Sequence, residues 1–133
     1  MLRSSILVAL ALVAVGCMGN SDATEGSVAS HFESPEAEGG RYREAFAALD
    51  KEYNTLAVER REAYMLRDSA SRAEALLTNN RAAEEHRERL RLTDSAWLIT
   101  ARHFYEVGNG GFTTLAEEFG TDSVALARRL LRL

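Results

Sequence analysis

The chain has 133 residues, with 16 Lys or Arg, 20 Asp or Glu, one Pro and one Cys. That length allows one small domain and excludes a multidomain enzyme, and one cysteine cannot close an internal disulfide or build a cysteine-based zinc site. Few prolines and aromatic residues argue against a β-sandwich, whereas abundant Ala, Leu, Glu and Arg favour helices. The composition therefore predicts an all-α protein and indicates no activity.

The first residues are typical of an export signal. Arg3 supplies one positive charge before ten consecutive apolar residues, 6–15. A helix needs roughly 20 apolar residues to cross a bilayer core of about 30 Å, so ten suit the apolar centre of a signal peptide better than a membrane span. The segment Ala14-Val15-Gly16-Cys17 that closes it resembles the lipobox of bacterial lipoprotein signal peptides.

This resemblance implies that the signal peptide, residues 1–16, is removed and that Cys17 carries a diacylglycerol and usually a further acyl chain such as palmitate. Two or three acyl chains on one cysteine would hold the protein firmly on a membrane, whereas one chain binds reversibly. The implied location is the bacterial cell envelope, facing the periplasm or the exterior, and Met18 after the cysteine favours the outer membrane. A plain secretory signal and an uncleaved helical anchor are the alternatives.

A flexible acidic tether is predicted next, so that residues 17–40 join the lipidated cysteine to the folded part. Residues 18–40 contain five acidic residues, no Lys or Arg and no apolar period. Such a segment buries too little apolar surface to offset its conformational entropy. Ser34 and Pro35 suit the N-cap and first position of a short helical turn, which we expect Gly39-Gly40 to interrupt.

Two amphipathic stretches then predict a long helical hairpin. Apolar residues recur with spacings of three and four over 42–56, and the stretch 83–104 repeats every seven residues. We expect helices over about 41–77 and 81–107. Thr78-Asn79-Asn80 would form the turn, since Asn accepts the left-handed conformation that ends helices and also caps the next one. One continuous helix is the alternative, because no Gly or Pro lies at that point.

Two short helices are predicted at the C-terminus, over about 113–119 and 122–132. The segment Thr114–Glu117 matches a capping box, Gly120 breaks the first short helix, and a polar residue among 121–123 caps the second. Their apolar side chains should fold back on the open face of the hairpin and give a small bundle.

The helical domain, residues 41–133, should therefore have one core. We expect Trp97 and Phe104 to pack against Tyr53 and Phe46. The predicted core consists of Phe46, Leu49, Tyr53, Leu56, Leu90, Trp97, Phe104, Leu115, Phe119 and Leu130.

The stretch 112–131 resembles the bacterial helix-turn-helix motif, with Ala116, Gly120 and Leu126 at its small, turn and buried aliphatic positions. The resemblance implies a DNA-facing surface formed by Val124, Ala125 and Arg128. Residues 41–133 hold 15 basic and 15 acidic side chains, so the domain lacks the positive charge that dominates DNA affinity. We therefore expect no nucleic-acid partner, and a DNA-binding regulator is a remote alternative.

Candidates for a chemical site are few. His103 and Glu106 lie three apart on one helical face and, with His86, are weak metal candidates. No nucleophile elbow or phosphate-binding loop occurs, so we expect no enzyme, cofactor or small-molecule substrate. The leading hypothesis is a lipid-anchored, non-enzymatic envelope protein that acts through protein–protein interaction or self-association, as an assembly subunit, adaptor or small chaperone. A periplasmic metal or stress sensor is the alternative.

Overall fold

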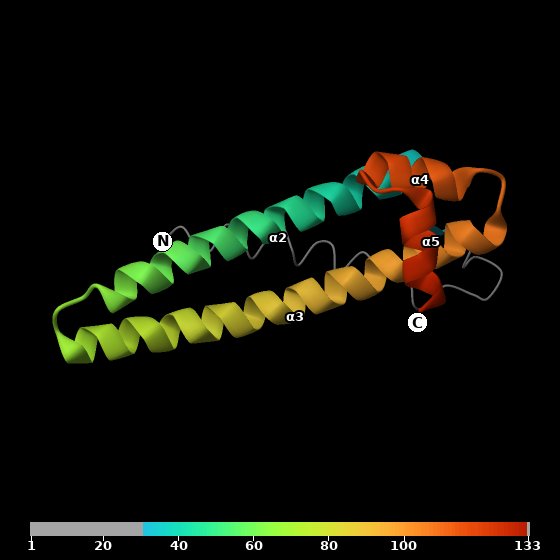
Figure 1. Cartoon of the computed structure of the whole chain (residues 1–133). Coiled ribbons are helices and arrows are strands. Elements are labelled where there is room, and N and C mark those ends of the chain that lie inside the picture. Colours follow the sequence, from blue (N-terminus) through green and yellow to red (C-terminus); the bar gives the residue numbers. More distant parts are fainter. Residues whose placement is uncertain (1–30, 133) are drawn as a thin grey trace. The chain divides into compact units, whose positions relative to one another are not determined.

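The fold is that of a computed structural model, which describes residues 31–132. Its four helices are α2 (Pro35–Tyr64), α3 (Ser69–Val107), α4 (Gly111–Phe119) and α5 (Ser123–Leu131) (Figure 1). Residues 31–132 contain no strand. The predicted all-α fold with two long and two short helices is confirmed, and the alternative of one continuous helix was wrong. No helix in the described part of the chain is sufficiently long and apolar to cross a membrane.

The described chain divides into two compact units. Unit 1 contains residues 31–45 and 92–132, and unit 2 contains residues 46–91. Unit 2 is a helical hairpin in which sections of α2 and α3 run antiparallel (Figure 1). Unit 1 combines the first turns of α2 and the last turns of α3 with the two short helices, which pack against them.

Helix α2 begins earlier than the sequence indicated. Ser34 Oγ accepts a hydrogen bond from the Ala37 N–H (3.2 Å), and Pro35 is the first helical residue. Gly39 and Gly40 do not interrupt the helix, so the predicted end of the tether at residue 40 was wrong. The earlier part of the tether, the signal peptide and Cys17 lie outside the described residues.

Gly39 lies where α4 crosses α2 in unit 1. A Cβ at this position would lie 2.7 Å from both the Leu115 carbonyl oxygen and the Glu118 Cβ. Such distances are far shorter than van der Waals contact, so only a glycine allows α4 to approach this closely. The glycine that was interpreted as a helix breaker is therefore a packing residue inside a helix.

The turn of the hairpin lies at residues 65–68, and not at Thr78-Asn79-Asn80 as predicted. Asp68 caps α3, because its Oδ2 accepts hydrogen bonds from the Ser71 N–H (2.9 Å) and the Ser71 hydroxyl (2.6 Å). Asn79 lies inside α3 instead, where it is buried and its Nδ2 donates to the Leu56 carbonyl oxygen (2.9 Å). The asparagine that suggested a turn therefore joins the two helices of unit 2.

Trp97 is the centre of the core of unit 1. Its side chain is 1% exposed, and its ring stacks on Phe119 with a centroid distance of 4.2 Å. Tyr42 packs on it with a centroid distance of 5.3 Å. The predicted contact with Tyr53 was wrong, because the turn lies about three helical turns earlier than expected and shifts the register of the two long helices.

The short helices follow the prediction closely, apart from one cap. Gly120 has a φ of +95° and ends α4, and Asp122 Oδ1 accepts a hydrogen bond from the Val124 N–H (3.0 Å). The predicted capping box was wrong, because α4 begins three residues before Thr114. The Thr114 hydroxyl bonds back to the Gly110 carbonyl oxygen (3.3 Å), as threonine does within helices.

Most of the predicted core side chains are removed from solvent, but two are not. Tyr53 is 60% exposed and Leu90 is 39% exposed, so the expectation that they belong to the core was wrong. Of the other predicted core residues, five are buried and three are of intermediate burial. The buried ones are Leu49, Trp97, Phe104, Leu115 and Leu130, and the intermediate ones are Phe46, Leu56 and Phe119. Both exceptions lie in unit 2, whose two helices have no further helix of the same unit to cover them.

Candidate functional site: the groove of the helical hairpin

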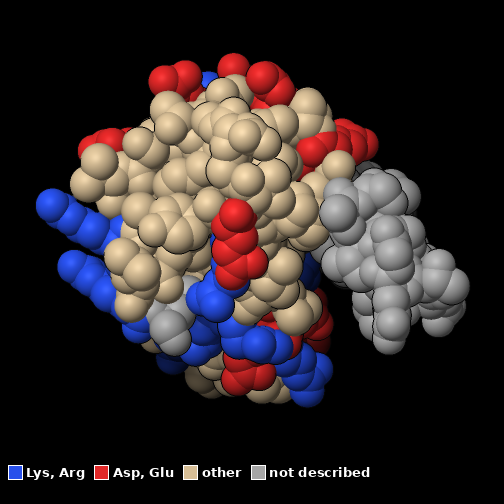
Figure 2. Space-filling view, turned by 90° about the vertical axis from the view of Figure 1, so that its right-hand side faces the viewer, with Lys and Arg blue, Asp and Glu red and all other residues tan. Residues whose placement is uncertain are grey.

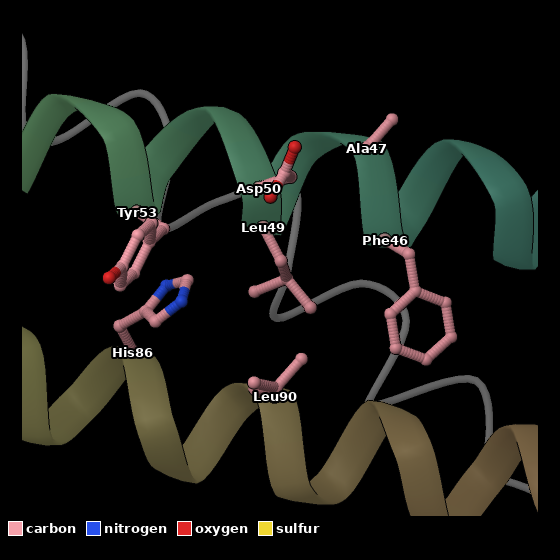
Figure 3. Close-up of a pocket in the computed structure, with 7 residues that line it drawn as sticks. All are labelled: Phe46, Ala47, Leu49, Asp50, Tyr53, His86 and Leu90. Atoms are coloured by element: carbon pink, nitrogen blue, oxygen red, sulfur yellow. The ribbon is translucent and has the colours of Figure 1, made fainter.

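The candidate site is a groove between α2 and α3 in unit 2. Two adjoining depressions of about 510 Å³ and about 280 Å³ form it, and Tyr53 and His86 line both. Figure 3 shows Tyr53 from α2 and His86 from α3 facing one another, with Leu49 pointing toward Leu90 beside them. The groove therefore follows the seam along which the two helices meet.

The walls of the groove are mostly apolar. Both helices contribute residues three or four positions apart, which is the spacing of one helical face. The first depression is lined by Phe46, Ala47, Leu49, Asp50, Tyr53, His86 and Leu90. The second is lined by Tyr53, Leu56, Ala57, Arg60, Asn79, Ala83, His86 and Arg87.

Unit 2 has very little apolar core beneath this groove. Within residues 46–91, Leu49 and Ala63 are the buried apolar side chains, and the other two buried residues are Asn79 and His86. A two-helix unit gains its stability mainly from the apolar surface that it buries. The hairpin thus leaves on its surface side chains that a larger bundle would bury.

A polar cluster lies next to the groove. Glu52 forms an ion pair with Arg89, and its other carboxylate oxygen lies 3.5 Å from His86 Nδ1. All three side chains are less than 20% exposed. Within residues 31–132, neither Glu52 Oε2 nor His86 Nδ1 has a hydrogen-bond partner. Burial lowers the pKa of His86, because a desolvated imidazolium is disfavoured.

The chemistry available to this cluster is limited. An imidazole beside a carboxylate is the base and orienting pair that many hydrolases use. The described residues that line the groove include no Ser, Thr or Cys that could serve as a nucleophile. The ring of Tyr53, which carries the one lining hydroxyl, has its centroid 6.1 Å from that of His86. The geometry therefore fits a polar contact that fixes the register of the two helices better than a catalytic dyad.

The weak metal candidates are not brought together. His103 lies in unit 1, where its ring stacks on Phe32 with a centroid distance of 4.3 Å, and Glu106 is exposed nearby on α3. His86 belongs to unit 2. Among the residues that the structure describes, no group of three or more His, Cys, Asp or Glu side chains could hold a metal ion.

The helix-turn-helix resemblance corresponds to a real helical corner. Ala116 and Leu126 are buried between the short helices, and Gly120 makes the turn. Val124, Ala125 and Arg128 are exposed, as the resemblance implies. Figure 2 shows a face of the molecule on which acidic side chains lie along the upper edge and at the centre, and basic side chains lie at the left and below, with acidic ones among them. This mixture of charges differs from the continuous positive surface of proteins that bind the DNA backbone.

Comparisons with known proteins add no relative. No family model, curated protein or solved structure matches the chain.

Sequence reasoning missed the place of Asn79 on this face of α3, although the signal was present. Asn79, Ala83, His86 and Leu90 follow one another at spacings of four, three and four, which places Asn79 on a helical face.

Proposed function

We propose that this protein is a lipid-anchored, non-enzymatic component of the bacterial envelope that binds another protein through the groove of unit 2. The observation that carries the proposal is this apolar, solvent-exposed groove on a hairpin with few buried apolar residues. Its role would be that of an assembly subunit, adaptor or small chaperone.

The lining of the groove, and its place between two paired helices, suit a helix-binding surface. Grooves between paired helices accept the apolar face of an amphipathic helix through side chains at every third or fourth position. Tyrosine is enriched at the centres of protein interfaces, because it combines a large apolar ring with a polar hydroxyl. Tyr53 stands at the middle of the groove, where it lines both depressions and is 60% exposed.

The membrane anchor in this proposal depends on the lipobox-like sequence that ends at Cys17. In cells fed a clickable palmitate analogue, we expect the wild-type chain to carry the label in the membrane fraction. The Cys17→Ala variant should carry none, because it lacks the acylated sulfur. Label that persists in the variant, or unlabelled full-length chain in the cytosol, would contradict the anchor.

Photo-crosslinking in intact cells tests the binding surface. A photoreactive phenylalanine at position 53 should yield a discrete protein adduct, because the ring would contact the bound partner. The matched control places the same residue at Asn54, which is exposed on the next position of α2 and does not line the groove. Equal adducts from both positions, or none from position 53, would count against the groove as a binding surface.

A further inference from the structure

We infer that the occupant of the groove is a second copy of this chain, so that two hairpins pack groove to groove in a four-helix arrangement. This inference rests on the proposed function and names its partner. It follows from the way in which opposite charges are distributed over the two walls of the groove.

Close to the centre of the groove the two walls carry charges of opposite sign. A further basic residue, Arg60, lies farther along the α2 wall, where it donates a hydrogen bond to Asn80 Oδ1 (2.7 Å). Asp50 stands on the α2 wall and Arg87 on the α3 wall, and both are exposed. Tyr53 and His86 face one another across the groove (Figure 3). Asp50 comes three residues before Tyr53 and Arg87 one residue after His86, so in this antiparallel pair the two charges lie within about 3 Å of the same level along the axis.

A two-fold axis along the groove makes these charges complementary between copies. Such an axis places α2 of one copy over α3 of the other and keeps every residue at its own level. Asp50 of each copy then faces Arg87 of the other, which gives two equivalent ion pairs, as expected of an isologous interface. The remaining charges do not oppose pairing, because residues 46–91 contain, besides Asp50 and Arg87, eight basic and eight acidic side chains.

The same arrangement covers the exposed apolar side chains. Each Tyr53 would lie against the α3 wall of the other copy, and each Leu90 against the α2 wall. In this arrangement each helix is antiparallel to its two neighbours. Four such helices around a common core bury one stripe of each helix, which a hairpin alone leaves open to solvent. A second copy therefore matches the groove in both polarity and charge.

Charge exchange between two copies tests this arrangement. Two differently tagged full-length chains are expressed together in bacteria, extracted in mild detergent and purified through one tag, and the recovery of the other tag is measured. Wild-type copies should be recovered together. Asp50→Arg paired with itself, and Arg87→Asp paired with itself, should each lower the recovery by about tenfold or more, because both contacts become repulsive.

Co-expression of Asp50→Arg with Arg87→Asp should restore the recovery, since the two substituted side chains then attract one another in one contact and the native pair forms in the other. Far-UV circular dichroism of each variant controls for folding, and both exchanged positions are exposed on helices. Variants that pair with themselves as well as wild type does, or folded variants that fail to pair when mixed, would overturn the inference.

The crosslink from position 53 separates this inference from the proposed function. A chain-to-chain adduct supports both. An adduct with a different protein and none between chains would overturn the second copy as occupant but retain the groove as a binding surface. The absence of any adduct would overturn both.

Discussion

At the residue scale, two neighbouring residues of the same type have very different roles. Gly39 and Gly40 are adjacent in α2, yet a Cβ at Gly39 would collide with α4, whereas a Cβ at Gly40 would meet no atom within 4 Å. Their occurrence is visible in the sequence, but the contact that distinguishes them depends on where α4 packs. No local pattern could therefore separate a helix breaker from a packing glycine.

The two glycines allow a matched test of that contact. Gly39→Ala should lower the free energy of unfolding by about 1–3 kcal/mol, because the added methyl group forces α4 away from α2. Gly40→Ala should raise it by about 0.5–1 kcal/mol, because alanine favours a helix and the site is open. Chemical denaturation of each variant measures both changes. Equal effects of the two substitutions would refute the close approach of α4 at Gly39.

His86 should make the stability of unit 2 depend on pH. Burial holds the pKa of the folded His86 below the ordinary value of 6.5, so the unfolded chain takes up this proton first as the pH falls. The contribution of His86 to the free energy of unfolding is therefore constant above about pH 7, and this free energy declines as the pH drops below about 6.5.

Urea titrations followed by circular dichroism at several pH values between about 7.5 and 5.5 measure this decline. In His86→Gln the decline should be smaller, because glutamine does not titrate. An unchanged slope in the variant would show that His86 does not cause the effect.

At the scale of elements, the sequence indicated which helices exist better than where they begin and end. The seven-residue repeat through Leu90, Trp97 and Phe104 correctly predicted a helix, because a long apolar stripe at this spacing is typical of an amphipathic helix. The position of the turn could not be predicted from Asn79 and Asn80. Asparagine favours helix ends only when its amide has no better partner, and Asn79 finds one in the Leu56 carbonyl group.

The true start of α3 depends on a cap that can be removed. Asp68→Ala should lower the thermal midpoint, because the first N–H groups of α3 lose an acceptor that Asp68 supplies to Ser71. Asp68→Asn should largely retain the midpoint, since asparagine caps as well as aspartate does. A thermal scan of the three proteins decides the point. If the alanine variant matches wild type, Asp68 does not stabilise the start of α3.

At the scale of the whole molecule, the two units differ in how they bury apolar surface. Unit 1 buries Trp97 against rings from α2 and α4, whereas unit 2 places a polar cluster and a groove where a core would be. The core of unit 1 was accessible to sequence reasoning because its large apolar residues repeat regularly. The groove was not, because Tyr53 and Leu90 follow the same repeat as buried residues and only the absence of a covering helix in unit 2 exposes them.

The core of unit 1 should be sensitive to loss of its central ring. Trp97→Ala should lower the free energy of unfolding by about 3–5 kcal/mol, because it leaves a cavity beside Phe119 and Tyr42. Ile99→Ala is the matched control on the same helix, and should change stability by less than about 0.5 kcal/mol because Ile99 is exposed. A change below about 1 kcal/mol for Trp97→Ala would contradict its central place.

Hydrogen exchange of the full chain, followed over a range of protein concentrations, tests the central claim that a second copy of the chain covers the groove. If a second copy occupies the groove, the backbone amides of residues 49–57 and 83–90 should exchange more slowly as the concentration rises, because association stabilises the hairpin. The amides of α4, which lies in unit 1, should not change in step with them. Exchange in unit 2 that is slow and independent of concentration would contradict the account, because the hairpin would then be stable without a partner.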